Sequence, residues 1–585
     1  MVAVSTTAAV PEGRVVRVSG SLVEVERLPG TVISEVVTLG RVGLLGEVVA
    51  ITDGVLTVQA YEDTGGLGPG APAAALGRPL SAALGPHLLG GVFDGLLRPL
   101  SEAGDWLGPG AGAAPADPRR WSFTPTVAPG ARLGAGEEVG TLDGDGPLAL
   151  RVTVQPGVPA DDRGTVESVV PAGEYRSEET LAVVGGRPVT MATTWPVRHP
   201  RPFRARMDDV AALHTGQRVL DLLQPIARGS TASVPGGFGT GKTMLLQQIA
   251  KWCDADVIVY VGCGERGNEM ADIVEELQSL VDPRTGRPLR LRTVVIANTS
   301  NMPMMAREAS IYTGVTVAEY FRDMGLHAVV IADSTSRWAE ALREFASRRG
   351  ALPAEEGYPA GLASALAAFY ERAGDVRTLG GRRGSVTIIG AASPPGGDMT
   401  EPVTAHTQRF VRATWMLDRD LAYARHYPAV AWAGSFSRDA GALAAWHARN
   451  GDAAWGRRRA RMGSLLADSD RLASLAELVG EGAMPGSERV VLLAGRLLRD
   501  SVLRQSALSP NDGFCSVAKG AALVDAVLAV VDRCQGLVEA GVPATRIEEV
   551  DLGALVRAAE ATGPADVDGV LARRDRVLAE LEGLS

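Results

Sequence analysis

One run of eight residues organises this chain: Gly236-Gly237-Phe238-Gly239-Thr240-Gly241-Lys242-Thr243. It matches G-x-x-x-x-G-K-[ST], a loop whose glycines let backbone N–H groups approach phosphate oxygens. Lys242 offers a positive charge to the β and γ phosphates, and the hydroxyl of Thr243 suits Mg²⁺. The alternative is a glycine-rich turn that contains Lys-Thr by chance.

The residues on either side of the loop favour the phosphate site. Thr231 to Val234 read as a short buried strand, and Leu245, Ile249 and Trp252 share one helical face. Strand, loop and helix are the context that the motif requires, and the helix adds the positive end of its dipole. The sequence therefore predicts a bound nucleoside triphosphate.

Composition describes an ordinary globular protein of several domains. At 585 residues the chain is too long for one core, and about three or four domains are expected. Hydrophobic residues make up 46% and charged residues 22%. The net charge of −10 does not favour nucleic acid as the main partner.

The cysteines and the apolar runs point to a reducing compartment and a soluble chain. Cys253, Cys263, Cys515 and Cys534 form no C-x-x-C pair, so neither a zinc site nor a disulfide framework is indicated. The residues from Met1 to Val10 do not resemble a signal peptide. The chain has no run of about 18 apolar residues, the length that a membrane span needs. Docking on a membrane assembly remains compatible with this pattern.

The first third of the chain reads as β structure. In residues 1–75, short β-rich runs separated by glycines predict a small barrel: Arg14 to Val18, Leu22 to Val25, Gly46 to Ala50 and Leu56 to Gln59. Residues 76–195 predict a second β-rich unit that contains a low-complexity loop at Gly108 to Asp117. Strands are expected there at Ala149 to Val154 and Gly164 to Val170. Trp195 to Pro202 reads as a stiff linker because three prolines interrupt it.

Strands and helices alternate from residue 196 to 440, which predicts an α/β doubly wound domain. Its wholly apolar strands are typical of a parallel sheet buried on both faces: Val257 to Val261, Thr293 to Ala297, Ala328 to Ala332 and Val386 to Ile389. Ligands are expected at the carboxyl ends of these strands. Residues 441–585 read as a helical bundle, with one apolar face through Leu465, Leu472, Leu475 and Leu478.

Two carboxylates follow strands of the α/β domain. Asp333 ends the Ala328 to Ala332 strand, where an aspartate can orient Mg²⁺; its alternative role is to cap the next helix. Glu265 follows the Val257 to Val261 strand and can polarise a water that attacks the γ-phosphate. Arg266 beside it can bind phosphate or pair with an acid. The alternative for both is a solvated turn with Asn268 as a helix cap.

Sequence spacing does not identify two further parts of a nucleotide site, the adenine pocket and the arginine finger. Adenine needs an apolar or aromatic slot, for which Tyr427-Pro428 and Phe410 are candidates, although ordinary core packing explains them equally well. No arginine finger can be assigned inside the chain, and hydrolases of this kind often receive it from a neighbouring subunit.

Several runs resemble the catalytic A subunit of V-type and archaeal A-type rotary ATPases. They occur in the family's order, cover nearly the whole chain and match most tightly over residues 195–435. The runs are Tyr61 to Leu67, Gly262 to Met270, Ala306 to Gly314, Ala332 to Glu344, Ser393 to Asp398 and Arg425 to Pro428. The region 76–195 resembles the extra N-terminal region that separates A subunits from B subunits and from F-type β subunits.

The resemblance implies a multidomain α/β fold: an N-terminal β-barrel, a β-rich inserted domain, a RecA-like P-loop domain and a C-terminal helical bundle. It implies turnover of ATP and ADP with Mg²⁺ in an alternating hexamer of A and B subunits, in which the neighbour supplies the arginine finger. Central and peripheral stalk subunits are implied partners, and the membrane sector, which moves H⁺ or Na⁺, is met only indirectly. The implied location is peripheral, on the cytoplasmic face of the membrane.

The family's functional residues transfer to matching positions of this chain. Glu265 is similar to the catalytic glutamate and Arg266 to the phosphate-side arginine. Lys242 and Thr243 match the phosphate lysine and the Mg²⁺ hydroxyl, and Asp333 lies in a highly specific metal-side motif. Two residues on the base side also match, Tyr427 at an aromatic position that flanks adenine and Gln505 at a glutamine near the base.

Four positions depart from the family pattern. Gly237 stands where proline is common, and Thr240 where eukaryotic members have cysteine, so thiol control of the loop is not expected. Leu508 replaces a usual phenylalanine of the adenine wall, and Ala365 replaces a usual arginine. None of these changes removes the phosphate lysine, the metal hydroxyl or the two carboxylates.

Two competing functions use the same core. A non-catalytic nucleotide-binding subunit of a rotary ATPase would lack the loop lysine or the base, and this chain has both Lys242 and Glu265. A hexameric export or nucleic-acid motor ATPase is disfavoured by the net charge of −10 and by the β-rich insertion before residue 195.

Overall fold

The structure of the protein is a computed structural model that describes residues 12–100, 119–143, 146, 148–156, 163–282 and 284–584. The chain forms two compact units. The first comprises Met1–Met207, Ala255–Gly390 and Glu401–His406, and the second comprises Asp208–Asp254, Ala391–Thr400 and Thr407–Ser585. The predictions for Met1 to Val10 and Gly108 to Asp117 lie outside the described residues. The division into domains at 75, 195 and 440 stays a prediction.

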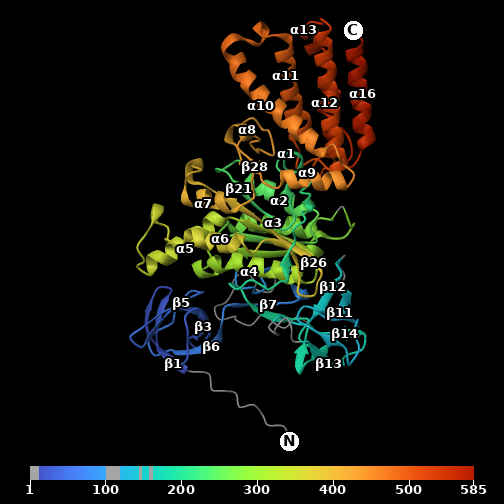
Figure 1. Cartoon of the computed structure of the whole chain (residues 1–585). Coiled ribbons are helices and arrows are strands. Elements are labelled where there is room, and N and C mark those ends of the chain that lie inside the picture. The colour runs from blue at the N-terminus through green and yellow to red at the C-terminus, as the bar shows by residue number, and fades with distance from the viewer. Residues whose placement is uncertain are drawn as a thin grey trace. The chain divides into compact units, whose positions relative to one another are not determined.

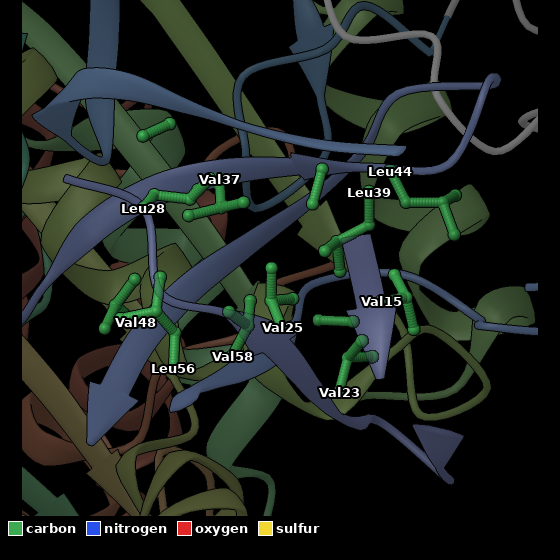
Figure 2. Packing of buried hydrophobic residues seen from close by; sticks show 13 residues of the cluster. Val15, Val23, Val25, Leu28, Val37, Leu39, Leu44, Val48, Leu56 and Val58 are labelled. Carbon is green, nitrogen blue, oxygen red and sulfur yellow. The ribbon is translucent and has the colours of Figure 1, made fainter. Parts of the chain in front are cut away.

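The first unit begins with a closed six-stranded barrel, drawn in blue in Figure 1, whose strand order is β1-β2-β5-β4-β3-β6. The strands are β1 (Glu12–Ser19), β2 (Leu22–Glu26), β3 (Glu35–Leu39), β4 (Leu44–Thr52), β5 (Val55–Ala60) and β6 (Pro72–Pro79). Alternate residues point inward, so Val23 and Val25 are fully buried while Glu24 between them is not. Figure 2 shows these valines among the aliphatic residues that fill the barrel. The predicted barrel is confirmed.

Two four-stranded antiparallel sheets follow the barrel. The first has the order β10-β13-β15-β16 and the second β12-β11-β9-β14. Their strands are β9 (Trp121–Pro125), β10 (Arg132–Leu133), β11 (Glu138–Asp143), β12 (Leu150–Thr153), β13 (Gly164–Val169), β14 (Gly173–Tyr175), β15 (Ala182–Val184) and β16 (Arg187–Val189). A separate ribbon joins β7 (Ser81–Leu84) to β17 (Thr193–Pro196), so the predicted linker begins as a paired strand.

The first unit also contains a parallel sheet in the order β8-β23-β22-β24-β26. Its strands are β8 (Val92–Phe93), β22 (Val257–Cys263), β23 (Thr293–Asn298), β24 (His327–Asp333) and β26 (Arg383–Ala392), and β25 (Gly374–Arg377) pairs antiparallel to β26. A short edge strand, β18 (Ala205–Arg206), pairs with β25. The helices of this unit are α3 (Gly267–Ser279), α4 (Met304–Asp323), α5 (Thr335–Arg348) and α6 (Leu362–Tyr370). Every residue of β22 and β23 is buried, as the apolar runs predicted.

A partly buried group of charges connects the barrel to α4 inside the first unit. The guanidinium of Arg198 contacts both Glu308 on α4, at 2.7 and 2.8 Å, and Glu47 on β4, at 3.3 Å. The hydroxyl of Tyr61 donates a hydrogen bond to Glu47. Tyr61 is fully buried, and its burial and the charge of Glu47 raise the pKa of its hydroxyl well above the usual value, so it stays a donor.

The second unit places a short strand before the glycine-rich loop. Strand β21 (Thr231–Pro235) pairs parallel to β27 (Ala413–Thr414), which pairs antiparallel to β28 (Phe436–Ser437). The loop follows β21 and leads into α2 (Lys242–Trp252). The other elements nearby in the sequence are β19 (Ala212–Leu213), α1 (Arg218–Leu223), β20 (Ile226–Ala227), α8 (Arg419–Tyr423) and α9 (Ala440–Arg449). Helix α7 (Pro402–Phe410) carries residues of both units.

The rest of the second unit is a helical bundle, drawn in orange and red in Figure 1. Its long helices are α10 (Trp455–Val479), α11 (Gly486–Leu497), α12 (Val517–Glu539) and α16 (Val567–Glu582), with a π-helical turn at Leu498–Leu503. Three short helices, α13 (Ala544–Glu548), α14 (Gly553–Val556) and α15 (Ala558–Ala561), precede α16. Neighbouring helices pack in the order α10, α11, α12 and α16. Among the described residues, no helix is both long and apolar enough to cross a membrane.

One prediction for the bundle is wrong in part. Leu465 and Leu472 are buried on α10, but Leu475 is 42% and Leu478 is 83% exposed. The buried side continues instead through the small residues Ala473 and Ala476, which pack beside Leu472. A stripe of leucines at helical spacing therefore turns away from the bundle at its C-terminal end.

Candidate active site

The glycine-rich loop is a tight curl between β21 and α2. Gly239 and Gly241 have φ angles of +79° and +81°, in the left-handed region that favours glycine. The hydroxyl of Thr240 donates to the carbonyl of Gly237 at 2.8 Å, which closes the curl from inside. Gly236 donates its N–H to the carbonyl of Ala392 at 3.1 Å. The motif thus has the backbone form that phosphate binding requires, and Phe238 at its crest is 93% exposed.

Lys242 and Thr243 begin α2, where the backbone N–H groups and the helix dipole favour an anion. Both side chains are half-buried. The ammonium of Lys242 donates to the hydroxyl of Ser393 and lies 3.5 Å from the carbonyl of Ala392. Ser393 begins the Ser393 to Asp398 run, and sequence spacing alone does not connect it with the loop.

Two predicted base-side residues lie in the same unit as the loop. The ring of Tyr427 lies beside Gly241. A Cβ added to Gly241 would be 3.2 Å from Cε1 of the ring. Gln505 donates its backbone N–H to the carbonyl of Tyr427 at 2.8 Å. Tyr427 is 42% exposed, and Leu508, three residues after Gln505, is 90% exposed. The other aromatic candidate, Phe410, is 36% exposed.

The side chain of Gln505 is occupied by backbone groups. Its carboxamide oxygen accepts from the N–H of Arg218 at 2.8 Å, and its amide nitrogen donates to the carbonyls of Gly216 and Asp512, each at 2.9 Å. Gln505 is only 3% exposed. These bonds hold Gln505 in place, and its backbone N–H is the group that reaches Tyr427.

In the first unit, Glu265 occupies a turn directly after β22. Gly264, with a φ of +76°, donates its N–H to the carbonyl of Asn298 at 2.7 Å, and Ser300 donates to the carbonyl of Glu265 at 2.9 Å. These bonds tie the turn to the end of β23. The side chain of Glu265 is half-buried. The turn therefore presents its carboxylate at the carboxyl ends of the parallel strands, where ligands bind in such sheets.

Arg266 follows Glu265 and points into solvent. Its side chain is 72% exposed and lies 4.0 Å from Glu269, an exposed ion pair that contributes little to stability. Helix α3 begins at Gly267 with Arg266 as its N-cap position, so Asn268 does not cap the helix. The structure thus removes Asn268 as the cap, while the exposed side chain of Arg266 agrees with the solvated-turn alternative.

Two arginines that spacing did not single out flank the turn. A Cβ added to Gly264 would lie 2.8 Å from Cβ of Arg337 and 3.2 Å from Cδ of Arg307. Only glycine fits this contact. Hydrogen bonding to Glu340 raises the pKa of Arg337, and the charges of Glu340 and Glu265 add to the rise. A permanently charged guanidinium therefore lies beside the Glu265 turn.

Asp333 ends β24 and is fully buried. The hydroxyl of Tyr260 on β22 donates to its Oδ2 at 3.1 Å. Burial, the charge of Asp333 and that of Glu265 all raise the pKa of Tyr260 well above its usual value, so the tyrosine stays protonated. The helix-capping alternative belongs to Ser334, whose side chain accepts from the N–H of Arg337 at 3.4 Å.

The residues predicted to serve Mg²⁺ have suitable chemistry. Thr243 offers a hydroxyl oxygen and Asp333 a carboxylate oxygen, and Mg²⁺ prefers hard oxygen ligands. Mg²⁺ in nucleotide sites is held by one or two such groups together with phosphate oxygens. Each of the two residues by itself offers an oxygen of the kind that Mg²⁺ binds.

Four family models match consecutive parts of the chain. The beta-barrel domain of the ATP synthase alpha/beta family matches residues 15–77, and the alpha/beta subunit barrel-sandwich domain matches 115–198. The nucleotide-binding domain of the ATP synthase alpha/beta family matches residues 216–437. The C-terminal domain of V and A type ATP synthase matches residues 444–543.

Whole-chain relatives carry the same assignment. The V-type ATP synthase alpha chain of Anaeromyxobacter dehalogenans (strain 2CP-C) is 49% identical, over 96% of this chain and 99% of its own length. The chain belongs to the family of V-type and A-type ATP synthase alpha chains, also called A subunits. A relative from Thermococcus sibiricus, the A subunit of an A-type ATP synthase, is 44% identical over 92% of this chain and 93% of its own length.

Family membership confirms several predictions. The chain has the predicted fold class, binds nucleotide through an ATP synthase domain, and is the catalytic, ATPase subunit of a rotary enzyme. It is a subunit of a V- or A-type ATP synthase complex. The match to the C-terminal domain of V and A type enzymes separates it from export and nucleic-acid motors that share the core.

Proposed function

We propose that Lys242, Thr243, Glu265, Arg266 and Asp333 carry out ATP turnover in this protein. The observation that carries the proposal is the loop itself, a left-handed curl at Gly239 and Gly241 that leads directly into α2. Its backbone N–H groups and the ammonium of Lys242 bind the β and γ phosphates. The rest of the loop, from Gly236 to Thr240, forms the wall of the phosphate site.

Glu265 acts as the general base. Its carboxylate accepts a proton from water as the water oxygen attacks the γ-phosphorus and the bond to the bridging oxygen of ADP breaks. The guanidinium of Arg266 binds the phosphoryl oxygens, which an exposed arginine with a weak partner is free to do. In the direction of synthesis the same groups act in reverse.

Thr243 and Asp333 hold Mg²⁺. When bound, the ion neutralises phosphate charge and orients the phosphate oxygens. The hydroxyl of Tyr260 donates to Oδ2 of Asp333 and so orients the carboxylate. Tyr427 flanks adenine, and Gln505 lies near the base, where it supports the backbone of Tyr427.

The protein works in an alternating hexamer with B subunits, and a neighbour supplies the arginine finger. Central and peripheral stalk subunits connect it to the membrane sector, where H⁺ or Na⁺ moves, and nucleic acid is not a partner. The complex holds it on the cytoplasmic face of the membrane. These assignments rest on family membership, and the whole-length match to subunits of ATP synthases supports them.

Glu265→Gln tests the catalytic assignment in the assembled complex. The substitution keeps size and removes the base, so we expect hydrolysis to fall by about 10²- to 10⁴-fold with ATP affinity nearly unchanged. Glu275→Gln is the matched control, because Glu275 is exposed on α3 and lies outside the proposed catalytic set. Unchanged turnover in Glu265→Gln would refute the assignment, and so would equal losses in the two variants.

A further inference from the structure

A buried ion pair lies on the base side of the second unit. Arg218, the first residue of α1, is 2% exposed, and Asp512 is 1% exposed. The guanidinium of Arg218 contacts both carboxylate oxygens of Asp512, one of them at 3.3 Å. The two residues are far apart in the sequence, and neither belongs to the proposed catalytic set.

Arg218 also holds the start of the segment that leads to Asp512. Its Nε donates to the carbonyl of Val502 at 2.6 Å, and its Nη2 donates to the carbonyl of Arg504. The carboxylate of Asp512 accepts from the backbone N–H of Ser506 at 2.7 Å. One guanidinium therefore joins both ends of residues 504–513, which we call the base-side loop.

A lysine anchors the far end of the base-side loop. The ammonium of Lys519 is buried and donates to the carbonyl of Asn511 at 3.0 Å. It also donates to the carbonyls of Ala559 and Thr562, at 2.7 and 3.0 Å. Hydrogen bonds thus hold the loop at its start and at its end, and the bond from Ser506 to Asp512 joins its two sides. Leu508 at its tip is 90% exposed.

The base-side loop is hydrogen-bonded to Tyr427, which lies on another segment of the chain. Gln505 lies inside the loop, with its side chain bonded to the backbone of Arg218 and Asp512. Its own N–H donates to the carbonyl of Tyr427, whose ring lies beside Gly241 of the phosphate loop. A continuous series of contacts therefore runs from the Arg218–Asp512 pair to the edge of the phosphate site.

We propose that Arg218 and Asp512 are positioning residues that set the adenine side of the nucleotide site by holding Gln505 and Tyr427 in register with the phosphate loop. The inference rests on the proposed function, because it assumes that Tyr427 flanks the base. The phosphate contacts of Lys242 do not depend on this pair. Loosening the pair weakens recognition of the base and leaves recognition of the phosphates intact.

Two ligands separate these effects in the full chain with Mg²⁺. ATP uses both the base side and the phosphate loop, whereas inorganic tripolyphosphate uses only the phosphate loop. We expect Asp512→Asn, which keeps the shape and removes the charge, to raise the Kd for ATP about tenfold. The Kd for tripolyphosphate, measured by displacement of a fluorescent ATP analogue, should change less than about twofold. Arg218→Lys keeps the charge but loses the planar fork, and should give the same selective loss.

Asp452→Asn is the matched control. Asp452 pairs with Arg458 at 2.7 Å near the start of α10, so the same change is made in a second, less buried arginine–aspartate pair. It should leave both dissociation constants unchanged. Tripolyphosphate binding also reports that each variant is folded around its phosphate loop.

Two results would overturn the inference. If both Asp512→Asn and Arg218→Lys bind ATP as the wild-type chain does, the pair positions nothing. If ATP and tripolyphosphate weaken equally, the pair supports the fold rather than the base side. A wild-type chain that binds neither ligand would instead refute the proposed function, and with it the premise of the inference.

Discussion

Replacing Gly241 by alanine should weaken ATP binding through backbone strain and a close contact with Tyr427. Gly241 has φ of +81° and ψ of 21°, in the left-handed region, where an L-residue costs about 1–2 kcal/mol. The new Cβ would also lie 3.2 Å from Cε1 of Tyr427, so the ring must move by a few tenths of an ångström. Because 1.4 kcal/mol is tenfold, the affinity for ATP should fall by about 5- to 30-fold.

Gly237→Ala is the control for this prediction. Gly237 is absent from the glycines with positive φ, and its added Cβ would meet only Cα of Gly397, at 3.9 Å. Alanine there removes freedom from the unfolded chain and should stabilise the protein by about 0.4–1 kcal/mol. ATP affinity should fall much less than in Gly241→Ala, because neither a left-handed backbone angle nor a contact with the Tyr427 ring is involved.

The assay is equilibrium binding of a fluorescent ATP analogue to the full-length chain, with a melting curve for each variant. A much larger loss of affinity in Gly241→Ala than in Gly237→Ala is the expected result. Wild-type affinity in Gly241→Ala would show that the curl of the loop is not needed for binding. An equal loss in Gly237→Ala would show that any methyl group in the loop disturbs it, whatever the local backbone angle.

Three further outcomes are expected. Lys242→Ala should abolish most binding of the ATP analogue, since the only side-chain charge of the loop is lost; retained affinity would count against the phosphate role. Tyr260→Phe removes the donor to buried Asp333 and should lower the free energy of unfolding by about 1.5–3 kcal/mol, so an unchanged urea midpoint would contradict the hydrogen bond. Burial and the charge of His214 lower the pKa of His447 to about 4, whereas an unfolded histidine titrates near pH 6.5, so protons favour the unfolded chain between these values. The melting temperature should therefore drop as the pH falls from about 6.5 to 4, and His447→Phe should show a smaller drop; equal slopes would refute this contribution.

The strands of the parallel sheet could be predicted because short, wholly apolar runs have few other uses in a globular domain. The run from Val257 to Val261 became β22, and the run from Ala328 to Ala332 became β24. In the barrel, β3 and β6 were not predicted. The inward residues Ala73 and Ala75 of β6 are small and carry none of the β-branched signal, whereas β3 carries that signal in Val36, Val37 and Thr38 and was missed all the same. On α10, the periodicity correctly predicted a helix, but it did not show which side of the helix packs against its neighbours at the C-terminal end.

The candidate site also has parts that the sequence predicts and parts that it does not. The loop from Gly236 to Thr243 and the strand-end carboxylates follow from local sequence, because each sits at a fixed offset from an apolar strand. Contacts between distant segments do not follow from it. Tyr260 reaches Asp333 across 73 residues, and Arg218 reaches Asp512 across 294. Such pairs form only when the sheet and the base-side loop have folded, so the spacing of residues along the sequence does not predict them.

The charges shared by the barrel and α4 limit how freely this fold can be recombined. Arg198 lies just after the ribbon strand β17, yet one of its two carboxylate partners, Glu47, comes from the barrel. A chain that began at residue 196 would keep Arg198 and Glu308 but lose Glu47 and the tyrosine bonded to it. The barrel is therefore not an exchangeable module. A chimera that takes its barrel from another protein must bring an acid at the position of Glu47, or leave a partly buried arginine with half of its counter-charge.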